Sequence, residues 1–312
     1  KIDYGIDLGT TNSAISRMQN GEAVIQKTDI LKDTMPSCIS FNKKKSIRAG
    51  ESAYSDLKKD RLKRMTKPEE KATNVFIEFK RTMGSDKSYF SSHMDKEYSS
   101  EELSAEILNT LKSYVKDENI HSAIVTVPAK FTSNQKDATL RAASLAGFSH
   151  CELLQEPIAA AMAYGVTSSN VDGYILVFDF GGGTFDAALL DVKEGIMKVT
   201  DTEGDNYLGG KNLDLAIVDE IIMPYLEENY SIDLILGNET KKTVFQDAMK
   251  DPAEKTKVQM SFDETHPLIT DLGDLGEDDD GEEIVLEITV TQNMMREAVS
   301  PIFQKSVDIT KA

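Results

Sequence analysis

Two glycine- and threonine-rich turns, each entered from an apolar strand-like run that ends in an aspartate, constrain this chain more than any other feature. The first turn covers residues 9–12 and follows Asp7; the second covers residues 181–184 and follows Asp179. Glycine lets backbone amides approach a ligand where a Cβ would block them, and threonine hydroxyls add donors, so each turn can hold phosphate oxygens. An aspartate at the end of a buried strand can hold Mg²⁺ through water molecules. The pattern therefore predicts two phosphate-binding turns with an adjacent metal site.

The two turns belong to two copies of one longer pattern. After each turn the sequence alternates like a strand, reverses at a residue followed by glycine, and continues as a short apolar strand. The strands are 13–18 and 23–25 in the first copy and 187–192 and 197–199 in the second, and the reversals are Asn20-Gly21 and Glu194-Gly195. This repetition predicts a duplicated unit. Two related halves that face each other would place both turns at one cleft.

Other glycine-rich motifs fit this sequence less well. A P-loop fails at segment 204–212, because Lys211 is displaced from the required position and no hydroxyl residue follows it. A dinucleotide-binding fingerprint fails because Asp186 stands where its third glycine belongs, and a strand follows instead of a helix. Two ordinary hairpins with tight turns are the alternative for either motif alone. Turn chemistry does not require the aspartate and the threonine to recur, so phosphate binding is favoured.

Composition limits the partners and the compartment. The chain has 312 residues, which is too long for one ordinary core, so at least two domains are expected. Its net charge of -18 argues against nucleic acid and anionic membranes as partners, because the long-range field repels both. Cys38 and Cys151 lie far apart and the four histidines show no ligand spacing, so neither zinc nor a disulfide framework is expected. Free thiols and the lack of an apolar run of membrane length favour a cytoplasmic protein.

Capping residues and apolar periodicity place several helices and strands. The expected elements are a helix that begins at Ser99 or Ser100, a buried strand at 123–127, a helix from Thr132 or Ser133 that Gly147 ends, a long helix that begins near residue 209 and is irregular at Pro224, and a helix that begins at Asp251-Pro252.

Two polar features have both a functional and an ordinary interpretation. Glu156 stands immediately before Pro157, where its carboxylate can project into a cleft or simply complement the dipole of the following helix. Glu254, Lys257 and Ser261 are spaced by three and four residues on one helical face, as they would be in any exposed polar stripe. The residues alone leave both alternatives open.

Taken together, the motifs are similar to those of one family. They are the segments 5–12, 125–129, 155–165 and 177–186, together with residues 204–205 and 208–210. On these motifs the chain resembles the nucleotide-binding domain of DnaK-type 70-kilodalton heat-shock chaperones, within the actin and hexokinase ATPase superfamily. The resemblance spans essentially the whole chain. It implies a duplicated ribonuclease-H-like α/β fold in which two lobes enclose a nucleotide cleft.

The resemblance also implies a domain organisation. Lobe I would cover residues 1–170, with a core subdomain at 1–35 and 95–170 and an outer subdomain at 36–94. Lobe II would cover residues 171–312, with a core subdomain at 171–208 and 292–312 and an outer subdomain at 209–291. The second core would be incomplete, because the family's second adenosine motif and closing helix would follow Ala312.

The family's functional residues fall on matching residues of this chain. The implied catalytic residues are Lys80, which would orient the attacking water, Glu156, which would position that water or accept its proton, Thr184, Asp7 and Asp179. The implied metal residues, for Mg²⁺ and flanking K⁺, are Asp7, Asp179 and Asp186. The implied nucleotide-binding residues are Gly9, Thr10, Thr11, Asn12, Gly181, Gly182, Gly183 and Thr184 at the phosphates, Gly209 and Gly210 through their backbone, and Glu254, Lys257 and Ser261 at the adenosine. Val258 departs from the family, which commonly has an arginine against the adenine.

The implied function is the binding and hydrolysis of ATP to ADP, which would switch a chaperone between peptide-binding states. The implied partners are a J-domain co-chaperone, a nucleotide exchange factor and unfolded client peptides, the last through a substrate-binding domain absent from this chain. A monomer is expected. Two other classes of the superfamily are alternatives: a sugar or acid kinase, which would need an acceptor pocket, and an actin- or MreB-like filament ATPase. The sequence Phe-Asp-Phe-Gly-Gly-Gly-Thr-Phe-Asp at the second turn favours the chaperone.

Overall fold

The computed structural model describes residues 2–66, 74–164, 172–270 and 275–312. These residues form an α/β protein, as predicted, in two compact units. The first unit comprises residues 1–56, 72–207 and Ala312, and the second comprises residues 57–71 and 208–311. The predicted boundary between lobes, at residues 170 and 171, lies outside the described residues and stays a prediction.

The central sheet of the first unit joins strands from distant parts of the sequence. Its strands are β1 (Tyr4–Leu8), β2 (Asn12–Gln19), β3 (Glu22–Ile25), β4 (Met35–Pro36), β10 (Ser122–Val127) and β11 (His150–Gln155). Their order is β11-β10-β1-β2-β3, with β4 paired to β2. β1 runs parallel to β10 and antiparallel to β2. Along β1, Ile6 and Leu8 are buried while Asp7 between them is exposed, so the strand ends with its carboxylate outside the core.

A second sheet of the first unit repeats this hairpin. It consists of β12 (Gly173–Phe180), β13 (Phe185–Lys193) and β14 (Ile196–Asp205), which pair antiparallel in that order. Asp179 pairs with Asp186 across the second hairpin, as Asp7 pairs with Ala14 across the first. The two hairpins therefore share one register.

The second reversals of the two copies match as well. Asn20 and Gly21 have φ values of 54° and 88°, and Glu194 and Gly195 have 48° and 87°. Two successive residues with positive φ form the type I′ turn, whose twist suits a tight hairpin. The duplication predicted from the sequence is thus present in the backbone as well.

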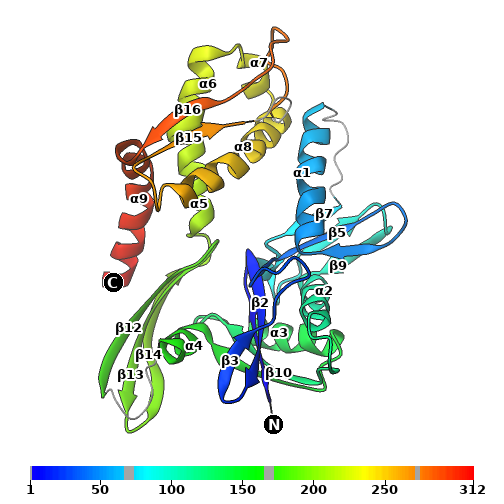
Figure 1. The fold of residues 1–312 in the computed structure, drawn as a ribbon, viewed down its shortest axis with the longest axis vertical. Helices are drawn as coiled ribbons and strands as arrows, with labels where there is room; N and C mark the ends of the chain where they lie inside the picture. Colours follow the sequence, from blue (N-terminus) through cyan, green and yellow to red (C-terminus); the bar gives the residue numbers. More distant parts are fainter. Residues whose placement is uncertain (1, 67–73, 165–171, 271–274) are drawn as a thin grey trace. The chain divides into compact units, whose positions relative to one another are not determined.

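Helices pack on both sheets of the first unit (Figure 1). They are α2 (Ser100–Ser113), α3 (Ser133–Leu145) and α4 (Glu156–Ala163). Ser99 caps α2 and Thr132 caps α3, each in a reciprocal capping box, as expected from the sequence. α2 and α3 bury apolar side chains against the central sheet, while Ala161 of α4 packs against Leu190 and Val192 of the second sheet.

The segment between β4 and α2 forms two small sheets, one α-helix whose residues from 57 on belong to the second unit, and one short 3₁₀ helix. These elements are β5 (Cys38–Phe41), β6 (Ile47–Ala49), α1 (Glu51–Thr66), β7 (Val75–Ile77), the 3₁₀ helix η1 (Phe79–Thr82), β8 (Ser88–Ser91) and β9 (Lys96–Ser99). Phe79 is only 2% exposed and belongs to the same core as β1. Because that side chain anchors η1, the next two residues, Lys80 and Arg81, are held in place.

The second unit is a helical layer with a two-stranded sheet. Its elements are α5 (Gly210–Ile217), the π-helical turn η2 (Val218–Ile222), α6 (Met223–Asn229), α7 (Asp233–Leu236), α8 (Glu239–Gln259), β15 (Thr265–Ile269), β16 (Glu287–Thr291) and α9 (Gln292–Lys311). Apolar residues of α8, α9, η2 and both strands form one core. The predicted irregularity at Pro224 is confirmed, because the π turn directly precedes it, where the proline cannot donate a helical hydrogen bond.

The predicted helix start at Asp251-Pro252 is wrong. Pro252 lies inside α8, which begins twelve residues earlier at Glu239. An interior proline costs a helix about 3 kcal/mol. Buried Phe245, Met249 and Ala253 pack α8 into the core on both sides of Pro252, and this burial outweighs the local cost.

Within the described residues, every helix lacks either the length or the apolar character that crossing a bilayer requires.

Candidate functional site

The two predicted turns are the loops 9–12 and 181–184 that close the matching hairpins. In the first loop, the Ser37 hydroxyl donates to the carbonyl of Gly9 at 2.7 Å. A Cβ on Gly9 would lie 2.0 Å from the carbonyl oxygen of Asn12. That neighbour is backbone and cannot swing aside, so this position accepts only glycine. In the second loop, the Gly181 amide donates to the carbonyl of Thr184 at 2.9 Å.

The two loops lie against each other. A Cβ on Gly182 would lie 2.2 Å from Thr11 Oγ1, so the second loop contacts the first at these residues. Thr11 Oγ1 is buried and has no hydrogen-bond partner among the described residues. A buried hydroxyl without a partner carries a desolvation penalty. An oxygen of a bound ligand at this point would remove the penalty.

A buried ion pair lies in the same unit. Lys80 Nζ and Glu156 Oε1 are 2.8 Å apart, and their side chains are only 9% and 16% exposed. Lys80 also lies over the ring of Phe131, 5.7 Å from its centroid. The pair joins η1 to the first residue of α4. Each charge depends on the other, because a buried charge without a partner is strongly destabilising.

Lys80 acts through its charge on three carboxylates, Glu156, Asp179 and Asp186, and the charge of Asp7 acts on Glu156 and Asp179. Burial raises the pKa of Glu156 even though Lys80 lowers it. Burial and then the charge of Asp7 raise the pKa of Asp179. Burial and then the charges of Glu156 and Asp179 raise the pKa of Asp186 to about 7. The excess of negative charge favours a bound cation, which would lower these pKa values again.

Asparagine at position 186 is expected to stabilise the nucleotide-free protein above pH 7. Asp186 is 5% exposed, and its pKa rises from the ordinary 3.8 to about 7 on folding. A raised pKa contributes stability below pH 4 that is lost as the pH rises through 7. Asp186→Asn mimics the protonated form, so its melting temperature should exceed the wild type's by several degrees at pH 8 and match it at pH 4. Each kcal/mol shifts the melting temperature by about 2–4 °C in a chain of this size.

Circular dichroism melts across this pH range measure the effect. Asp137→Asn on α3 is the matched control, because that carboxylate is exposed on the surface. A stabilisation by Asp186→Asn that does not change with pH would contradict the assigned cause.

The arrangement of acidic groups suits a hydrated metal ion that shares its ligands with a phosphate. The Thr126 hydroxyl donates to Asp7 Oδ1 at 2.9 Å, which orients that carboxylate at the end of β1. In the part of the chain that the structure describes, no three His, Cys, Asp or Glu side chains are grouped to hold a metal by themselves. Mg²⁺ commonly binds through one or two carboxylates, water and phosphate oxygens. Asp7 and Asp179, together with a ligand at the loops, fit that mode of binding.

The predicted adenosine residues lie in the second unit. Lys257 Nζ pairs with Asp214 Oδ1 at 2.6 Å and donates to the carbonyl of Gly210 at 3.3 Å. Asp214 is 6% exposed, and burial raises its pKa while Lys257 and its hydrogen bond lower it. Glu254 acts on the same carboxylate through its charge. Gly209 caps α5, and its amide donates to the Asn212 side chain.

Two of these residues line a mainly apolar groove of about 420 Å³ in the second unit. Its lining comes from α5, α9 and the end of α8, and consists of Leu213, Lys257, Val258, Met260, Ser261, Phe262, Met295, Val299 and Phe303. Ser261 Oγ also donates to the carbonyl of Lys257. A planar aromatic ring suits such a surface, whereas Glu254 lies outside the lining.

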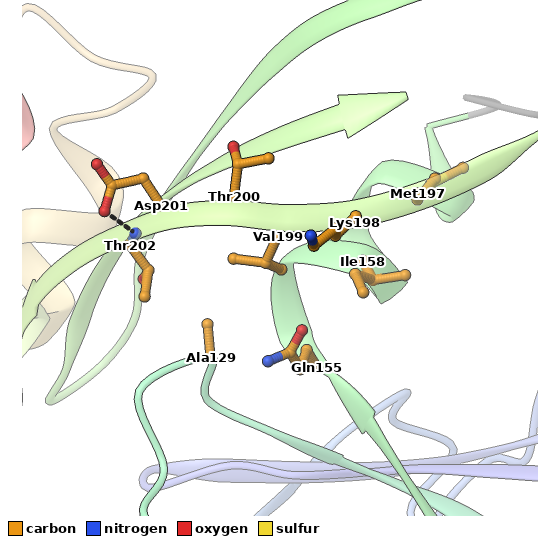
Figure 2. A pocket seen from close by; sticks show the side chains of 9 residues that line it. All are labelled: Ala129, Gln155, Ile158, Met197, Lys198, Val199, Thr200, Asp201 and Thr202. Atoms are coloured by element: carbon orange, nitrogen blue, oxygen red, sulfur yellow. Dashed lines mark hydrogen bonds between the residues drawn. The ribbon is translucent and has the colours of Figure 1, made fainter. Parts of the chain in front are cut away.

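Another groove, in the first unit, lies beside β14 (Figure 2). Val199 of β14 and the side chains of Gln155 and Ile158 face it. Its lining contains none of the predicted phosphate or metal residues. The groove is therefore separate from the loops, although Gln155 directly precedes Glu156.

Sequence reasoning missed two residues of these sites. Arg81 contacts the second loop, and Asp214 pairs with Lys257. No sequence pattern pointed to Arg81 except its position next to Lys80. Asp214 lies four residues after Gly210 at the start of one helix, a spacing that puts both on one face.

Comparison with known proteins identifies the family. A family model described as "Hsp70 protein" matches residues 3–312. The chain belongs to the Hsp70 family. The resemblance stated from the sequence motifs is thus confirmed, and the α/β fold with its repeated hairpins is the fold of an Hsp70 nucleotide-binding region in the actin-like ATPase class.

Curated members of the Hsp70 family align with most of this chain. "Chaperone protein DnaK" of Ureaplasma urealyticum serovar 10 is 36% identical over 264 residues, which is 84% of this chain and 40% of that protein. "Chaperone protein DnaK" of Ureaplasma parvum serovar 3 matches with the same identity and coverage. The aligned region therefore spans less than half the length of these Hsp70 proteins.

Proposed function

We propose that this chain binds and hydrolyses ATP as the nucleotide-binding part of a DnaK-type chaperone. The observation that carries the proposal is the contact between the two loops at Thr11 and Gly182, in the same unit as the Lys80–Glu156 pair. Phosphoryl transfer to water needs positioned reactants and neutralised charge more than covalent help from the protein. The first unit contains hydrogen-bond donors for phosphate at the loops, carboxylates that can hold a metal ion, and a paired lysine. These groups can supply the positioning and the charge neutralisation.

Each residue of the site has a proposed role. The loops would hold the β- and γ-phosphates, and Asp7 and Asp179 would hold Mg²⁺ through water, with Asp186 as a further acidic neighbour. Mg²⁺ would supply charge neutralisation on the phosphate oxygens. Lys80 would orient the attacking water, and Glu156 would position it or accept its proton. Burial raises the pKa of Glu156 above its ordinary value, which makes its carboxylate a better proton acceptor than an exposed glutamate. Flanking K⁺ is part of the proposal.

The apolar groove of the second unit supports the proposal that the nucleoside part of the bound nucleotide is adenosine. Lys257 from α8 and Ser261 from the turn that follows it would contact the adenosine, with Val258 offering an apolar face. Gly209 and Gly210 would approach the nucleotide through their backbone. Glu254 would face the adenosine from α8.

Thr184→Ala is expected to slow hydrolysis about tenfold to a hundredfold and to change the Kd for MgATP much less. The Thr184 hydroxyl stands at the end of the second loop, and removing one positioned donor has effects of this order or larger. Single-turnover phosphate release and a nucleotide titration by calorimetry measure the two quantities. Thr184→Ser keeps the hydroxyl and should retain most of the activity. Equal losses in binding and in turnover would reject the assigned role, and a wild type that neither binds nor hydrolyses MgATP would reject the proposed function.

The kinase and filament alternatives receive less support. The Hsp70 family match and the DnaK names of the relatives favour the chaperone. ATP-dependent phosphate release with water as the only acceptor separates the proposal from a kinase. ATP-dependent sedimentation would instead favour a filament protein.

The proposed partners come from the resemblance to DnaK-type chaperones. They are a J-domain co-chaperone, a nucleotide exchange factor and unfolded client peptides, the last through a substrate-binding domain of the chaperone. The proposed state is a monomer in the cytoplasm. The free thiols of Cys38 and Cys151 and the net charge of -18 suit a reducing compartment without nucleic acid or membrane as partner.

A further inference from the structure

Arg81 contacts the second glycine-rich loop from η1. Its Nη2 donates to the carbonyl oxygen of Gly183 at 2.6 Å, and its Nη1 pairs with Glu78 Oε2 at 2.8 Å. The centre of its guanidinium lies 5.5 Å from the ring centroid of Tyr207. The side chain is 18% exposed. Partners from three segments of the chain therefore hold this guanidinium in one place.

The same contact limits the space at position 183, where a side chain would require the guanidinium to shift. A Cβ there would lie 2.6 Å from Arg81 Nη2 and 3.2 Å from Cζ and Nε. The guanidinium thus occupies the space that any side chain at this position would need.

A fixed carbonyl orientation also fixes the amide that follows it. In a trans peptide the carbonyl of Gly183 and the N–H of Thr184 point in opposite directions. The hydrogen bond from Arg81 therefore directs the Thr184 amide away from the guanidinium. Hydrogen bonds from a charged donor are about twice as strong as neutral ones, so this orientation is established before a ligand binds.

We propose that Arg81 is a positioning residue that sets the Gly183–Thr184 peptide for phosphate binding. The proposal rests on the proposed function, because it takes the loop to bind phosphate. Arg81 holds the loop through the Gly183 carbonyl, so its loss should weaken binding more than chemistry. Lysine is a poor substitute because one ammonium cannot match the planar fork that serves Gly183, Glu78 and Tyr207 together.

The sequence permits a direct test of the peptide in the nucleotide-free chain. Glycine is followed by threonine at only two places, Gly9-Thr10 in the first loop and Gly183-Thr184 in the second. Labelling glycine carbonyls with ¹³C and threonine amides with ¹⁵N therefore gives two carbonyl-to-amide cross-peaks. Arg81→Met, which keeps the stem and removes the donors, should move the Gly183–Thr184 peak by more than a line width and leave the Gly9–Thr10 peak in place. The control Lys87→Met, at an exposed site, should move neither peak.

Nucleotide binding provides the second arm of the test. Arg81→Met should raise the Kd for MgATP about tenfold to a hundredfold, the range expected for losing a hydrogen bond from a charged group. kcat should fall by less than the Kd rises, and Arg81→Lys should give intermediate values. A melting curve close to the wild type's shows that the variant is folded.

The outcomes separate the two proposals. An unmoved Gly183–Thr184 peak overturns the role of Arg81, whatever the protein binds. A moved peak with an unchanged Kd also overturns it, because the contact then exists without positioning phosphate. If the wild type binds no MgATP, the proposed function is wrong, and so is the role of Arg81 in phosphate binding. A moved peak would in that case still show that Arg81 fixes the conformation of the loop.

Discussion

Lys80→Ala is expected to lower the single-turnover rate of ATP hydrolysis by about 10²- to 10⁴-fold while changing the Kd for ATP less than tenfold. This range is typical for the loss of a positioned proton-transfer group. Lys80 is buried and pairs with Glu156 at 2.8 Å. Without the ammonium, the pKa of Glu156 rises further, because the burial that raises it is no longer opposed. The variant therefore loses the lysine and makes Glu156 harder to ionise, and these are the two groups proposed to act on the attacking water.

Two variants control this measurement. Lys44→Ala removes an exposed lysine and should leave both rate and affinity unchanged. Glu156→Gln keeps the shape of the partner and removes its charge, so it should reproduce much of the loss in rate. Rapid-quench phosphate release gives the rate, and calorimetry gives the Kd. If Lys80→Ala weakens ATP binding as much as it slows hydrolysis, the lysine serves binding and its assignment to the attacking water is wrong.

Gly9→Ala is expected to weaken MgATP binding by more than about a hundredfold. The new Cβ would lie 2.0 Å from the carbonyl oxygen of Asn12, far inside van der Waals contact. The loop must open to admit it, which displaces the amides and the Thr11 hydroxyl from the phosphate position. A misplacement of about 1 Å in such a site can cost two orders of magnitude. Calorimetric titration with MgATP measures the change.

Gly21→Ala is the matched control for this substitution. Gly21 has a φ of 88° but no atom within 4 Å of an added Cβ. Alanine there introduces backbone strain of about 1 kcal/mol without a clash. It should lower the melting temperature slightly and leave MgATP binding unchanged. If Gly9→Ala binds MgATP as tightly as Gly21→Ala does, the first loop does not hold the phosphates.

Much of the fold near the site follows from local sequence signals. The matching hairpins were predicted from two Gly/Thr turns and two reversals, and the structure adds that Asp7 and Asp179 occupy equivalent ladder positions. The helix caps Ser99 and Thr132 could likewise be predicted from the sequence. A hydroxyl residue followed three residues later by Glu or Gln satisfies the free amides at a helix start. Such signals lie within a few residues of one another and need no knowledge of distant contacts.

Contacts between distant segments could not be predicted in this way. Nothing in the sequence around Lys80 distinguishes it from a surface lysine, and only the family resemblance assigned it a role. Its ion-pair partner Glu156 lies seventy-six residues later. Arg81 was missed for the same reason, since its partner Gly183 is even further along the chain. Pro252 illustrates the opposite error, because a strong local signal for a helix start was overridden by the burial of Met249 and Ala253.

The shared register of the two hairpins has an evolutionary consequence. Side chains alternate between the faces of a strand, so removing or inserting one residue in β2 or β13 would turn every later side chain to the opposite face. An insertion between Phe185 and Asp186, for example, would turn Asp186, which lies opposite Asp179, out of the acidic cluster. In related proteins, residues on the outward faces of β2 and β13 can therefore vary. The lengths of these two strands should stay constant, and insertions should accumulate in the segments that connect the repeats.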